Sequence, residues 1–482
     1  MLVAIDAGTT GARAVAVDLD GRVLHEARHA YPTAAPRPGW AEQDARDWRG
    51  RALDALAELR EALGGARPEA IGLTGQCPTV APVDERGDPV GPGLLYRDNR
   101  ATAQARAMRE RFGVEAMHAR TGHVATAFHV GPKVLWMREH APDVFAAAAR
   151  FAHPRDVVLR ALTGADSTDE TAANATVFFD LRARDWAHDM LEAFGLASSQ
   201  FPAVLAPWEV AGRLDDGTPV VIGAADSQCA AYGSGVSEPG PFSEMAGASS
   251  CLNSIVHEPL SEPRVTHYSH VTPGVYCTEI GLNTTGAAVR WAVEQLRFES
   301  FAELDERAAR VHGNLRAGGG DARAVAPLFL PYLGDGERDD PALRAGFVGV
   351  TDRHGRDELA YAVLEGVALG IEETLAVLTG AGAPLDELRV AGGLTRMRAL
   401  GPIKADVVGV PVVHLEADTA AVGAAMLAAA AAGHGDAADA AIAGLVARAA
   451  RFEPHPSDAL AARREWFRAV RASAAVRVEE AA

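Results

Sequence analysis

The stretch IDAGTTG at residues 5–11 combines a carboxylate, two glycines and two hydroxyls at a turn between apolar runs. Glycine lets the backbone turn sharply and lets another group approach it closely. Thr9 and Thr10 add hydroxyls beside exposed backbone N–H groups, and such a tip can form an anion-binding nest. The alternative is an ordinary glycine turn with Asp6 at its rim. The stretch is therefore a candidate site for a phosphate group.

A second tip of the same kind lies in the stretch EMAGASS at residues 244–250. Gly247, Ala248 and Ser249 stand between two apolar runs, as the first tip does. The likeness between the two stretches is short. A strand, a tip and a strand at the start of each half nevertheless indicate two related domains that face one another, and ligands generally bind in interdomain clefts.

The elements that must position these tips follow from the apolar periodicity and the turn residues. In the first half we expect strands at 2–5, 14–17, 23–30, 70–74 and 218–225, and helices at 44–64, 100–112, 132–150 and 227–232. In the second half we expect strands at 242–246, 251–256 and 275–281 and a helix at 286–296. Helices at 356–380, 397–409, 417–432 and 461–473 are expected to cover the second sheet. We place the boundary near residue 234, which gives domains 1–234 and 235–482.

Composition narrows the class of protein. The chain has 482 residues and a formal net charge of −18, which argues against nucleic acid or an anionic membrane as the main partner. The acidic balance leaves room for a phosphate site, because a local nest can bind an anion. The four cysteines lie far apart and favour reduced thiols over disulfides or a zinc site. The N-terminus lacks a basic targeting segment, and no apolar run reaches the ~18 residues of a membrane span. We therefore expect a cytoplasmic protein.

Six motifs in order along the chain carry a resemblance to a known family. They are IDAGTTG, YRDNRA at 96–101, GAADSQCAA at 223–231, LFLPYLGDGERDDP at 328–341, GFVGVTDRHGRDELAYAVLEG at 346–366 and RVAGGLTR at 389–396. With these motifs the chain resembles the FGGY carbohydrate kinases of the actin-like ATPase superfamily, from about residue 2 to about residue 432. The resemblance implies an α/β protein with two actin-like (ribonuclease H-like) domains. Each domain would be a mixed β-sheet flanked by helices, with a catalytic cleft between the two.

The implied activity is ATP-dependent phosphorylation of a sugar, ketose or polyol hydroxyl. Such a transfer needs a held γ-phosphate, a neutralising metal and a base for the accepting hydroxyl. Asp226 ends a strand at the expected N-cap of the next helix and matches the catalytic aspartate of the family; a plain N-cap is the alternative. Asp6, together with Asp226, is expected to hold Mg²⁺ beside the phosphates. The alternative for Asp6 is an aspartate that only caps a turn.

The resemblance also assigns nucleotide-binding residues. Thr9 and Thr10 of the first tip and Gly247, Ala248 and Ser249 of the second would hold the phosphates of ATP. The family often has a hydroxyl residue where this chain has Ala248, so backbone N–H groups and Ser249 are left to bind. The remaining matched positions are Gly286, Arg290, Gly392, Gly393, Leu394 and Met397. The pair Gly392-Gly393 would lie against adenosine, although a glycine pair at a strand end is also a common turn.

Substrate contacts are expected mainly from the first domain, at Gln76, Cys77, Pro78, Tyr96, Asp98, Phe128, His129 and Ser227. An aromatic face packs on the C–H surface of a sugar, while carboxylate and amide groups bind its hydroxyls. Xylulokinases usually have Met-His at the position of Cys77-Pro78, and glycerol kinases have Arg-Glu, which argues against glycerol. His129 is equally explained as a structural histidine.

The sequence thus favours a xylulokinase-like sugar kinase acting on a ketose, with a pentulose such as xylulose as first candidate. A kinase for another polyol or aldonate, of the gluconate, glycerol or tetritol type, is the alternative. A non-catalytic actin-like nucleotide switch is a different class. The expected partners are ATP, Mg²⁺ and a small sugar or polyol. The oligomeric state is open, and a homodimer is one of the states that the sequence allows.

Overall fold

The computed structural model describes residues 1–317, 325–334, 337, 340 and 342–479. Contacts divide the chain into two compact units that are discontinuous in sequence. Unit 1 contains Met1–Ser237, Val256–Thr278 and Asp418–Ala447, and unit 2 contains Glu238–Ile255, Glu279–Ala417 and Arg448–Ala482. The boundary near residue 234 stays a prediction, since the chain returns to the first unit twice after it.

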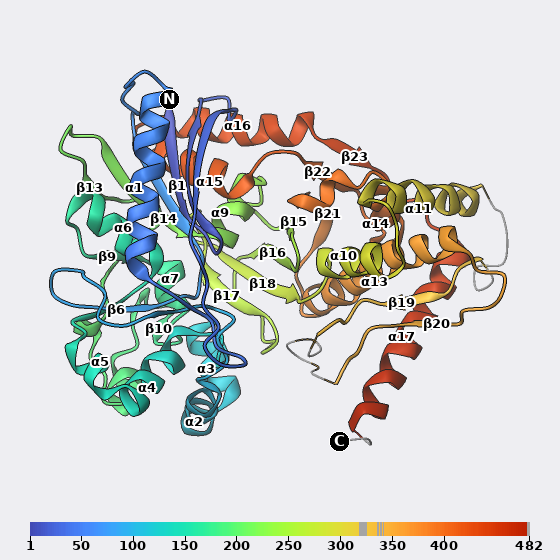
Figure 1. Ribbon diagram of the computed structural model, residues 1–482, viewed down its shortest axis with the longest axis horizontal. Helices are drawn as coiled ribbons and strands as arrows, with labels where there is room; N and C mark the ends of the chain where they lie inside the picture. The colour runs from blue at the N-terminus through green and yellow to red at the C-terminus, as the bar shows by residue number, and fades with distance from the viewer. Residues whose placement is uncertain (318–324, 335–336, 338–339, 341, 480–482) are drawn as a thin grey trace. The chain divides into compact units, whose positions relative to one another are not determined.

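Unit 1 is built on a six-stranded mixed sheet (Figure 1). Its strand order is β13 (Val210–Arg213), β14 (Pro219–Ala225), β5 (Ile71–Gly75), β1 (Leu2–Ala7), β2 (Gly11–Val17) and β3 (Val23–Ala30). The expected opening hairpin is present, with Ile5 opposite Ala14 in the antiparallel register. β5 is parallel to both β1 and β14.

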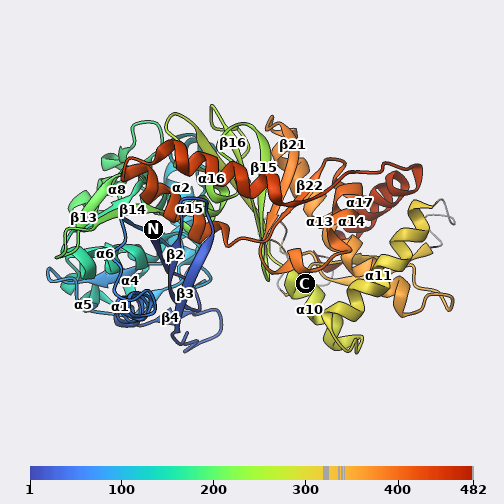
Figure 2. The same ribbon diagram turned by 90° about the horizontal axis from the view of Figure 1, so that it is seen from above.

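Several helices pack on this sheet. α1 (Ala45–Ala62) packs on β2 and β3 and buries Trp48, Leu56 and Leu59. α15 (Thr419–Ala431) packs on β1, β5 and β14 and against α9 (Asp226–Gly233) (Figure 2). The sequence-based expectation that 417–432 covers the second sheet is therefore wrong. The close approach depends on glycine, because a Cβ on Gly72 would lie 2.0 Å from the Ala424 carbonyl oxygen.

Among the other helices of unit 1, α6 (Pro154–Thr163) packs on α1 and on strands of the same sheet. These helices are α2 (Thr102–Phe112), α3 (Val114–Thr121), α4 (Val130–His140), α5 (Pro142–Ala147), α6 (Pro154–Thr163), α7 (Glu170–Asn174), α8 (His188–Ala193), η1 (Ser198–Gln200) and α16 (Gly435–Arg448). Four short strand pairs are β4 (Glu42–Gln43) with β7 (Gly93–Leu94), β6 (Ala81–Val83) with β8 (Arg150–Ala152), β9 (Ser167–Asp169) with β12 (Ala203–Leu205), and β10 (Phe179–Asp180) with β11 (Asp185–Trp186). The helix expected over 132–150 is broken at Ala141, because Pro142 disfavours a helical residue before it.

A seven-stranded sheet forms the core of unit 2. Its order is β17 (Thr266–Ser269), β18 (Tyr276–Leu282), β16 (Ser250–Val256), β15 (Gly240–Ala246), β21 (Leu385–Ala391), β22 (Val412–Leu415) and β23 (Ala450–Phe452). β17 lies in the segment assigned to unit 1. A small pair, β19 (Leu328–Leu330) with β20 (Gly346–Val348), accompanies the sheet. The second expected hairpin is present, with Met245 opposite Cys251.

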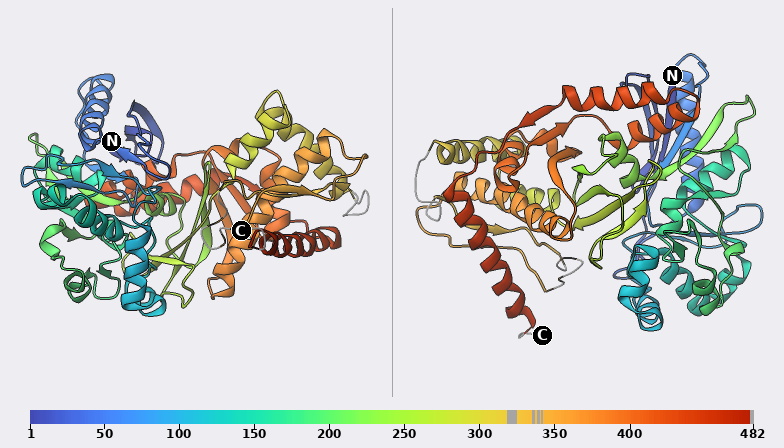
Figure 3. Two further views of the ribbon diagram at one scale, coloured as in Figure 1. Left: turned by 60° about the horizontal axis from the view of Figure 1, so that its bottom comes forward. Right: turned by 180° about the vertical axis from the view of Figure 1, so that it is seen from behind.

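The helices of unit 2 are α10 (Gly286–Gln295), α11 (Phe301–Arg316), α13 (Arg356–Gly380), η2 (Gly393–Arg396), α14 (Leu400–Val408) and α17 (Asp458–Glu479). α13 is buried along most of its length. It packs against α11, α14 and α10 (yellow to orange in Figure 3). No helix in the described part of the chain is long and apolar enough to span a membrane.

Candidate active site

Three parallel strands of unit 1 end at the same edge of their sheet. Ala7 of β1 and Ala225 of β14 are both in register with Gly75 of β5. The backbone N–H of Gln76 donates to the Ala7 carbonyl at 3.0 Å, which holds the two strand ends together. Asp6, Gln76 and Asp226 therefore lie at or directly after neighbouring strand ends. In open α/β sheets this carboxyl edge is where ligands bind.

The first tip holds its carbonyl groups inward. The Gly8 carbonyl accepts a hydrogen bond from the Tyr31 hydroxyl, the Thr9 carbonyl accepts one from Gln43 Nε2 at 2.8 Å, and the Thr10 carbonyl accepts one from the Tyr31 N–H at 3.3 Å. A trans peptide points its N–H opposite to its carbonyl. The N–H groups of Thr9 and Thr10 therefore face away from these partners, as an anion-binding tip requires.

Asp6 is buried and forms an ion pair that the sequence did not reveal. Its Oδ2 accepts hydrogen bonds from Arg13 at 3.0 and 2.5 Å, and Arg13 also pairs with Asp418 at the start of α15. Burial raises the pKa of Asp6, and Arg13 opposes that shift. Asp6 Oδ1 is buried and has no hydrogen-bond partner among the described residues. This oxygen is available to a cation or to a water bound to one.

Asp226 is the first residue of α9, and the N-cap is Ala225. The expectation that Asp226 itself caps the helix is thus off by one residue. Asp226 Oδ1 accepts a hydrogen bond from the Ser227 N–H at 2.9 Å. The Ala225 N–H donates at 2.9 Å to Thr171 Oγ1, which donates at 2.6 Å to Asp169. Hence the strand end before Asp226 is fixed by buried groups.

The predicted substrate contact Gln76 belongs to a buried polar network centred on Gln43, which was not predicted from the sequence. Gln43 Oε1 accepts from Gln76 Nε2 at 3.0 Å and from Trp48 Nε1 at 2.9 Å. Through its Nε2 the same side chain holds the Thr9 carbonyl. Gln43 therefore connects the first tip to the segment that carries Gln76. The signal in the sequence was a polar residue directly before an apolar helix, which is too common to be specific.

Cys77, Pro78, Tyr96 and Phe128 are further predicted substrate contacts. Cys77 is half-buried, and the bond between Cys77 and Pro78 is cis. The rings of Tyr96 and Phe128 meet edge to face, with centroids 6.1 Å apart. Lys133, fully buried, donates to the Phe128 carbonyl.

Asp98 uses its acceptor positions inside the protein. Oδ1 accepts from the N–H and Nε of Arg100 at 3.1 and 2.8 Å, and Oδ2 accepts from the Ala41 N–H at 2.6 Å and from the Arg100 guanidinium at 2.7 Å. The Arg100 guanidinium lies 3.5 Å from the centroid of the Trp40 ring. A carboxylate has about four acceptor positions, so Asp98 organises this segment.

His129 is 3% exposed and lies in a group of buried histidines. Its Nδ1 accepts from the Thr126 N–H at 3.1 Å, and its Nε2 lies 3.2 Å from His123 Nδ1. Burial lowers the pKa of His123 well below its usual range. These contacts account for His129 as a structural residue, and a contact with substrate stays a prediction.

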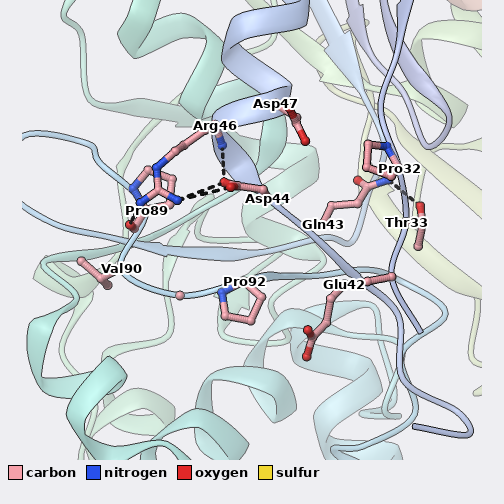
Figure 4. Close-up of a pocket in the computed structure, with 12 residues that line it drawn as sticks. Pro32, Thr33, Glu42, Gln43, Asp44, Arg46, Asp47, Pro89, Val90 and Pro92 are labelled. Atoms are coloured by element: carbon pink, nitrogen blue, oxygen red, sulfur yellow. Dashed lines mark hydrogen bonds and ion pairs between the residues drawn. The ribbon is translucent and has the colours of Figure 1, made fainter. Parts of the chain in front are cut away.

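A pocket of about 520 Å³ opens on unit 1 beside this network (Figure 4). Glu42, Gln43 and Asp44 line it together with three prolines, and Arg46 bridges Asp44 and the Pro89 carbonyl. The twelve residues drawn in the figure include none of the predicted sugar contacts. Two of its residues connect it to predicted sugar contacts: Gln43 bonds to Gln76, and Glu42 accepts a hydrogen bond from Arg100, which holds Asp98.

The second tip, in unit 2, has the same inward arrangement of its carbonyl groups. The Gly247 carbonyl accepts from the Gly286 N–H at 3.1 Å, and the Ala248 carbonyl accepts from the N–H groups of Thr285 and Ala287 at 3.0 and 2.9 Å. The N–H groups of Ala248 and Ser249 therefore point away from α10. A Cβ on Gly286 would lie 2.3 Å from the Gly247 carbonyl oxygen, so only glycine allows this contact.

The glycine pair after β21 lies at the same strand edge as the second tip, since Ala391 is in register with Met245. Gly392 has a φ of 107°, and a Cβ there would lie 2.6 Å from the Ala246 carbonyl oxygen. Gly393 faces open space. Of the other predicted nucleotide contacts, Leu394 and Met397 are buried and Arg290 is exposed on α10. The motif at 328–341 lies partly outside the described residues.

The described residues contain no cluster of three or more His, Cys, Asp or Glu side chains that could hold a metal ion. Mg²⁺ is commonly held by one or two carboxylates together with substrate phosphates. The unpartnered oxygen of Asp6 fits that type of site.

Comparison with known proteins defines the class of the protein. Residues 1–233 match the N-terminal domain, and residues 244–432 the C-terminal domain, of the FGGY family of carbohydrate kinases. A solved structure of xylulose kinase from Rhodospirillum rubrum is 29% identical, with a TM-score of 0.88 over 99% of each chain. The fold is thus that of two-domain α/β kinases with actin-like domains. The chain belongs to the FGGY family of carbohydrate kinases, enzymes that use ATP.

The relatives do not separate the possible substrates. A glycerol kinase from Janthinobacterium sp. (strain Marseille) is 30% identical over 451 residues, which cover 89% of both chains. A xylulose kinase from Escherichia coli (strain K12) is 27% identical over 423 residues, which cover 85% of both chains. The fold recognition made from the six motifs is confirmed. The sequence argument against glycerol receives no support from these identities.

Proposed function

We propose that this protein transfers the γ-phosphoryl group of ATP to a hydroxyl of a ketose, with a pentulose such as xylulose as first candidate. The observation that supports this most directly is the alignment of Asp6, Gln76 and Asp226 at neighbouring strand ends. One edge of unit 1 then offers a carboxylate for the cation, an amide for the sugar and a base. Unit 2 offers a second phosphate tip.

Asp226 acts as the general base in this proposal. A carboxylate in the first turn of a helix is favoured in its ionised form by the helix dipole. Near neutral pH it accepts the proton of the attacking sugar hydroxyl. Ser227, next to it in the first turn of α9, lies where it can bind a neighbouring sugar hydroxyl.

Asp6 and Asp226 would hold Mg²⁺, which supplies charge neutralisation at the transferred phosphoryl group when it is bound. Thr9 and Thr10 bind phosphate oxygens through N–H groups and hydroxyls. Gly247, Ala248 and Ser249 do the same in unit 2. Gly392 and Gly393 leave the space for adenosine, with Gly286, Arg290, Leu394 and Met397 around the nucleotide.

The sugar packs on the aromatic pair of Tyr96 and Phe128 and bonds to Gln76. Asp98 has a positioning role, because its acceptor positions are used by Arg100 and Ala41. Cys77 and Pro78 form a rigid wall of low polarity, since proline has no N–H donor and a fixed φ.

A panel of ketoses, alditols and aldonates, assayed for ATP consumption, tests this function. We include glycerol because a glycerol kinase is 30% identical to this chain, which makes a polyol kinase the second candidate. A buried substrate hydroxyl left unpaired costs about 1–3 kcal/mol. We therefore expect the double variant Cys77→Met, Pro78→His to improve kcat/KM for xylulose by ~10-fold or more. Turnover of glycerol above all ketoses would overturn the ketose assignment.

A further inference from the structure

A chain of buried side chains lies beneath the second tip, wholly within unit 2. Lys404 Nζ lies 2.5 Å from Glu244 Oε2, and both side chains are fully buried. Ser250 Oγ donates to Glu244 Oε1 at 2.8 Å and lies 3.0 Å from Thr285 Oγ1. The ion pair is thus linked through one hydroxyl to the residue directly before α10.

The ion pair determines which group donates and which accepts in each of these hydrogen bonds. The Glu244 carboxylate can only accept, and a hydroxyl carries one hydrogen. Ser250 therefore gives its hydrogen to Glu244 and accepts that of Thr285. Lys404 pairs with this carboxylate, so the ion pair fixes the orientation of both hydroxyls.

Thr285 is the point where the chain of side chains reaches the tip. Its N–H donates to the Ala248 carbonyl at 3.0 Å. The peptide partner of this carbonyl is the N–H of Ser249, which faces away from α10. The buried hydroxyls hold Thr285 in place, and a shift of its backbone would change the direction of the Ser249 N–H.

The direction of the backbone N–H groups matters because of the residues that form the second tip. The side chain of Ala248 has no hydroxyl, so phosphate recognition by the tip depends on backbone N–H groups and on Ser249. Burying an ion pair commonly stabilises a protein less than apolar residues of the same size would. A role in orienting the tip accounts for a fully buried Lys–Glu pair at this place.

We propose that Lys404, Glu244, Ser250 and Thr285 are positioning residues that orient the second tip for the nucleotide phosphates. This inference rests on the proposed function, which places the nucleotide at that tip. It adds four residues to the proposed nucleotide site, and none of them needs to contact the nucleotide.

Ser250→Ala and Thr285→Val test the proposal, because each removes one hydroxyl and leaves the ion pair in place. MgADP binding to the full-length protein, measured by calorimetry, needs no knowledge of the sugar. We expect each variant to weaken MgADP binding by ~3–10-fold, the effect of one hydrogen bond. KM for the best sugar should change less than two-fold, and Thr285→Ser should restore MgADP binding.

The matched control is Tyr361→Phe. Tyr361 is buried, and its hydroxyl donates at 3.0 Å to Glu365, which pairs with Arg463 in the same unit. This change also removes a hydroxyl from a buried ion pair, so it should lower the melting temperature to a similar extent and leave MgADP affinity unchanged. Equal MgADP affinities in Ser250→Ala, Thr285→Val and Tyr361→Phe would overturn the positioning role.

Gly286→Ala separates this failure from that of the proposed function. The new Cβ would lie 2.3 Å from the Gly247 carbonyl oxygen and would displace the tip itself, whatever the four residues do. Loss of MgADP binding in Gly286→Ala, with normal binding in Ser250→Ala and Thr285→Val, refutes only the positioning role. Normal binding in all three variants would mean that the nucleotide does not use this tip, which contradicts the proposed function itself.

Discussion

Asp226 stands on a backbone that buried groups hold in place. The bond from the Ala225 N–H to Thr171 Oγ1 fixes the strand end, and Asp169, paired with Arg155, holds the Thr171 hydroxyl. This support explains how one carboxylate could keep the position that a general base requires. The same support predicts that a change confined to the Asp226 carboxylate leaves the surrounding structure intact.

The variant Asp226→Asn should lower kcat by ~10²-fold or more, because the amide has the same size but cannot take the proton. MgADP affinity should fall far less than kcat, because Asp6 still holds the cation. Steady-state kinetics with the best sugar of the panel checks the first statement, and calorimetry checks the second. A kcat near that of wild type would remove Asp226 from the role of base.

The burial of Lys133 leads us to expect that the stability of the protein depends on pH. Burial lowers its pKa to about 7, and the charge of Asp98 opposes that shift. Between about pH 7 and the usual lysine pKa of about 10.4, the unfolded chain binds this proton and the native protein does not. Stability therefore rises with pH in this window through Lys133.

The variant Lys133→Met has no such titration. From pH 7 to pH 9, wild type should gain about 2 kcal/mol in the free energy of unfolding relative to Lys133→Met, at ~1.4 kcal/mol per pH unit. Urea denaturation of both proteins at each pH measures this difference. If the free energies of unfolding of wild type and Lys133→Met differ by the same amount at every pH from 7 to 9, the lowered pKa of Lys133 is wrong.

The sequence predicted site residues where the signal was local. Asp6, Gln76 and Asp226 each lie at or directly after the end of an apolar run, and the register of β1, β5 and β14 brings these ends together. Partners from distant segments were missed. Arg13 pairs with Asp6 and also with Asp418, which is 405 residues away, and no local pattern announces such a contact.

At the scale of elements, the hairpins and α13 could be predicted, because glycine turns and apolar periodicity are local properties. The position of α15 could not. Its alanine-rich sequence is compatible with any well-packed surface. The structure shows one glycine on each helix at the contact: Gly233 of α9 approaches the Thr419 carbonyl, and Gly423 of α15 approaches the Cys229 carbonyl. Two such contacts join α15 to α9 directly.

The variant Gly72→Ala tests this packing. The new Cβ would lie 2.0 Å from the Ala424 carbonyl oxygen, so β5 and α15 must separate. We expect a loss of about 1–3 kcal/mol in the free energy of unfolding, the usual cost of overpacking. Gly50→Ala in α1 is the control, because its Cβ would meet no atom within 4 Å and should stabilise the helix by about 0.5–1 kcal/mol. Equal stabilities of the two variants would contradict the close packing.

At the scale of the whole molecule, unit 1 is completed by a segment from the far end of the chain. Asp418–Ala447 belongs to this unit, although unit 2 supplies most of the residues between 279 and 417. α15 buries Val422, Met426 and a series of alanines in contact with β1, β5 and β14. The first 237 residues alone would therefore expose one face of their sheet.

This division predicts that the fragment 1–237 is less stable than the same fragment joined to 418–447. A short glycine-serine linker is enough, because a Cβ on Gly233 of α9 would lie 2.0 Å from the Thr419 carbonyl at the start of α15. Thermal unfolding followed by circular dichroism compares the two. A fragment 1–237 that unfolds cooperatively at the same temperature as the linked form would refute the requirement for α15.

An Asp418→Ala change in the linked form should lower its melting temperature, because Arg13 would lose a partner that reaches it only through the return of the chain.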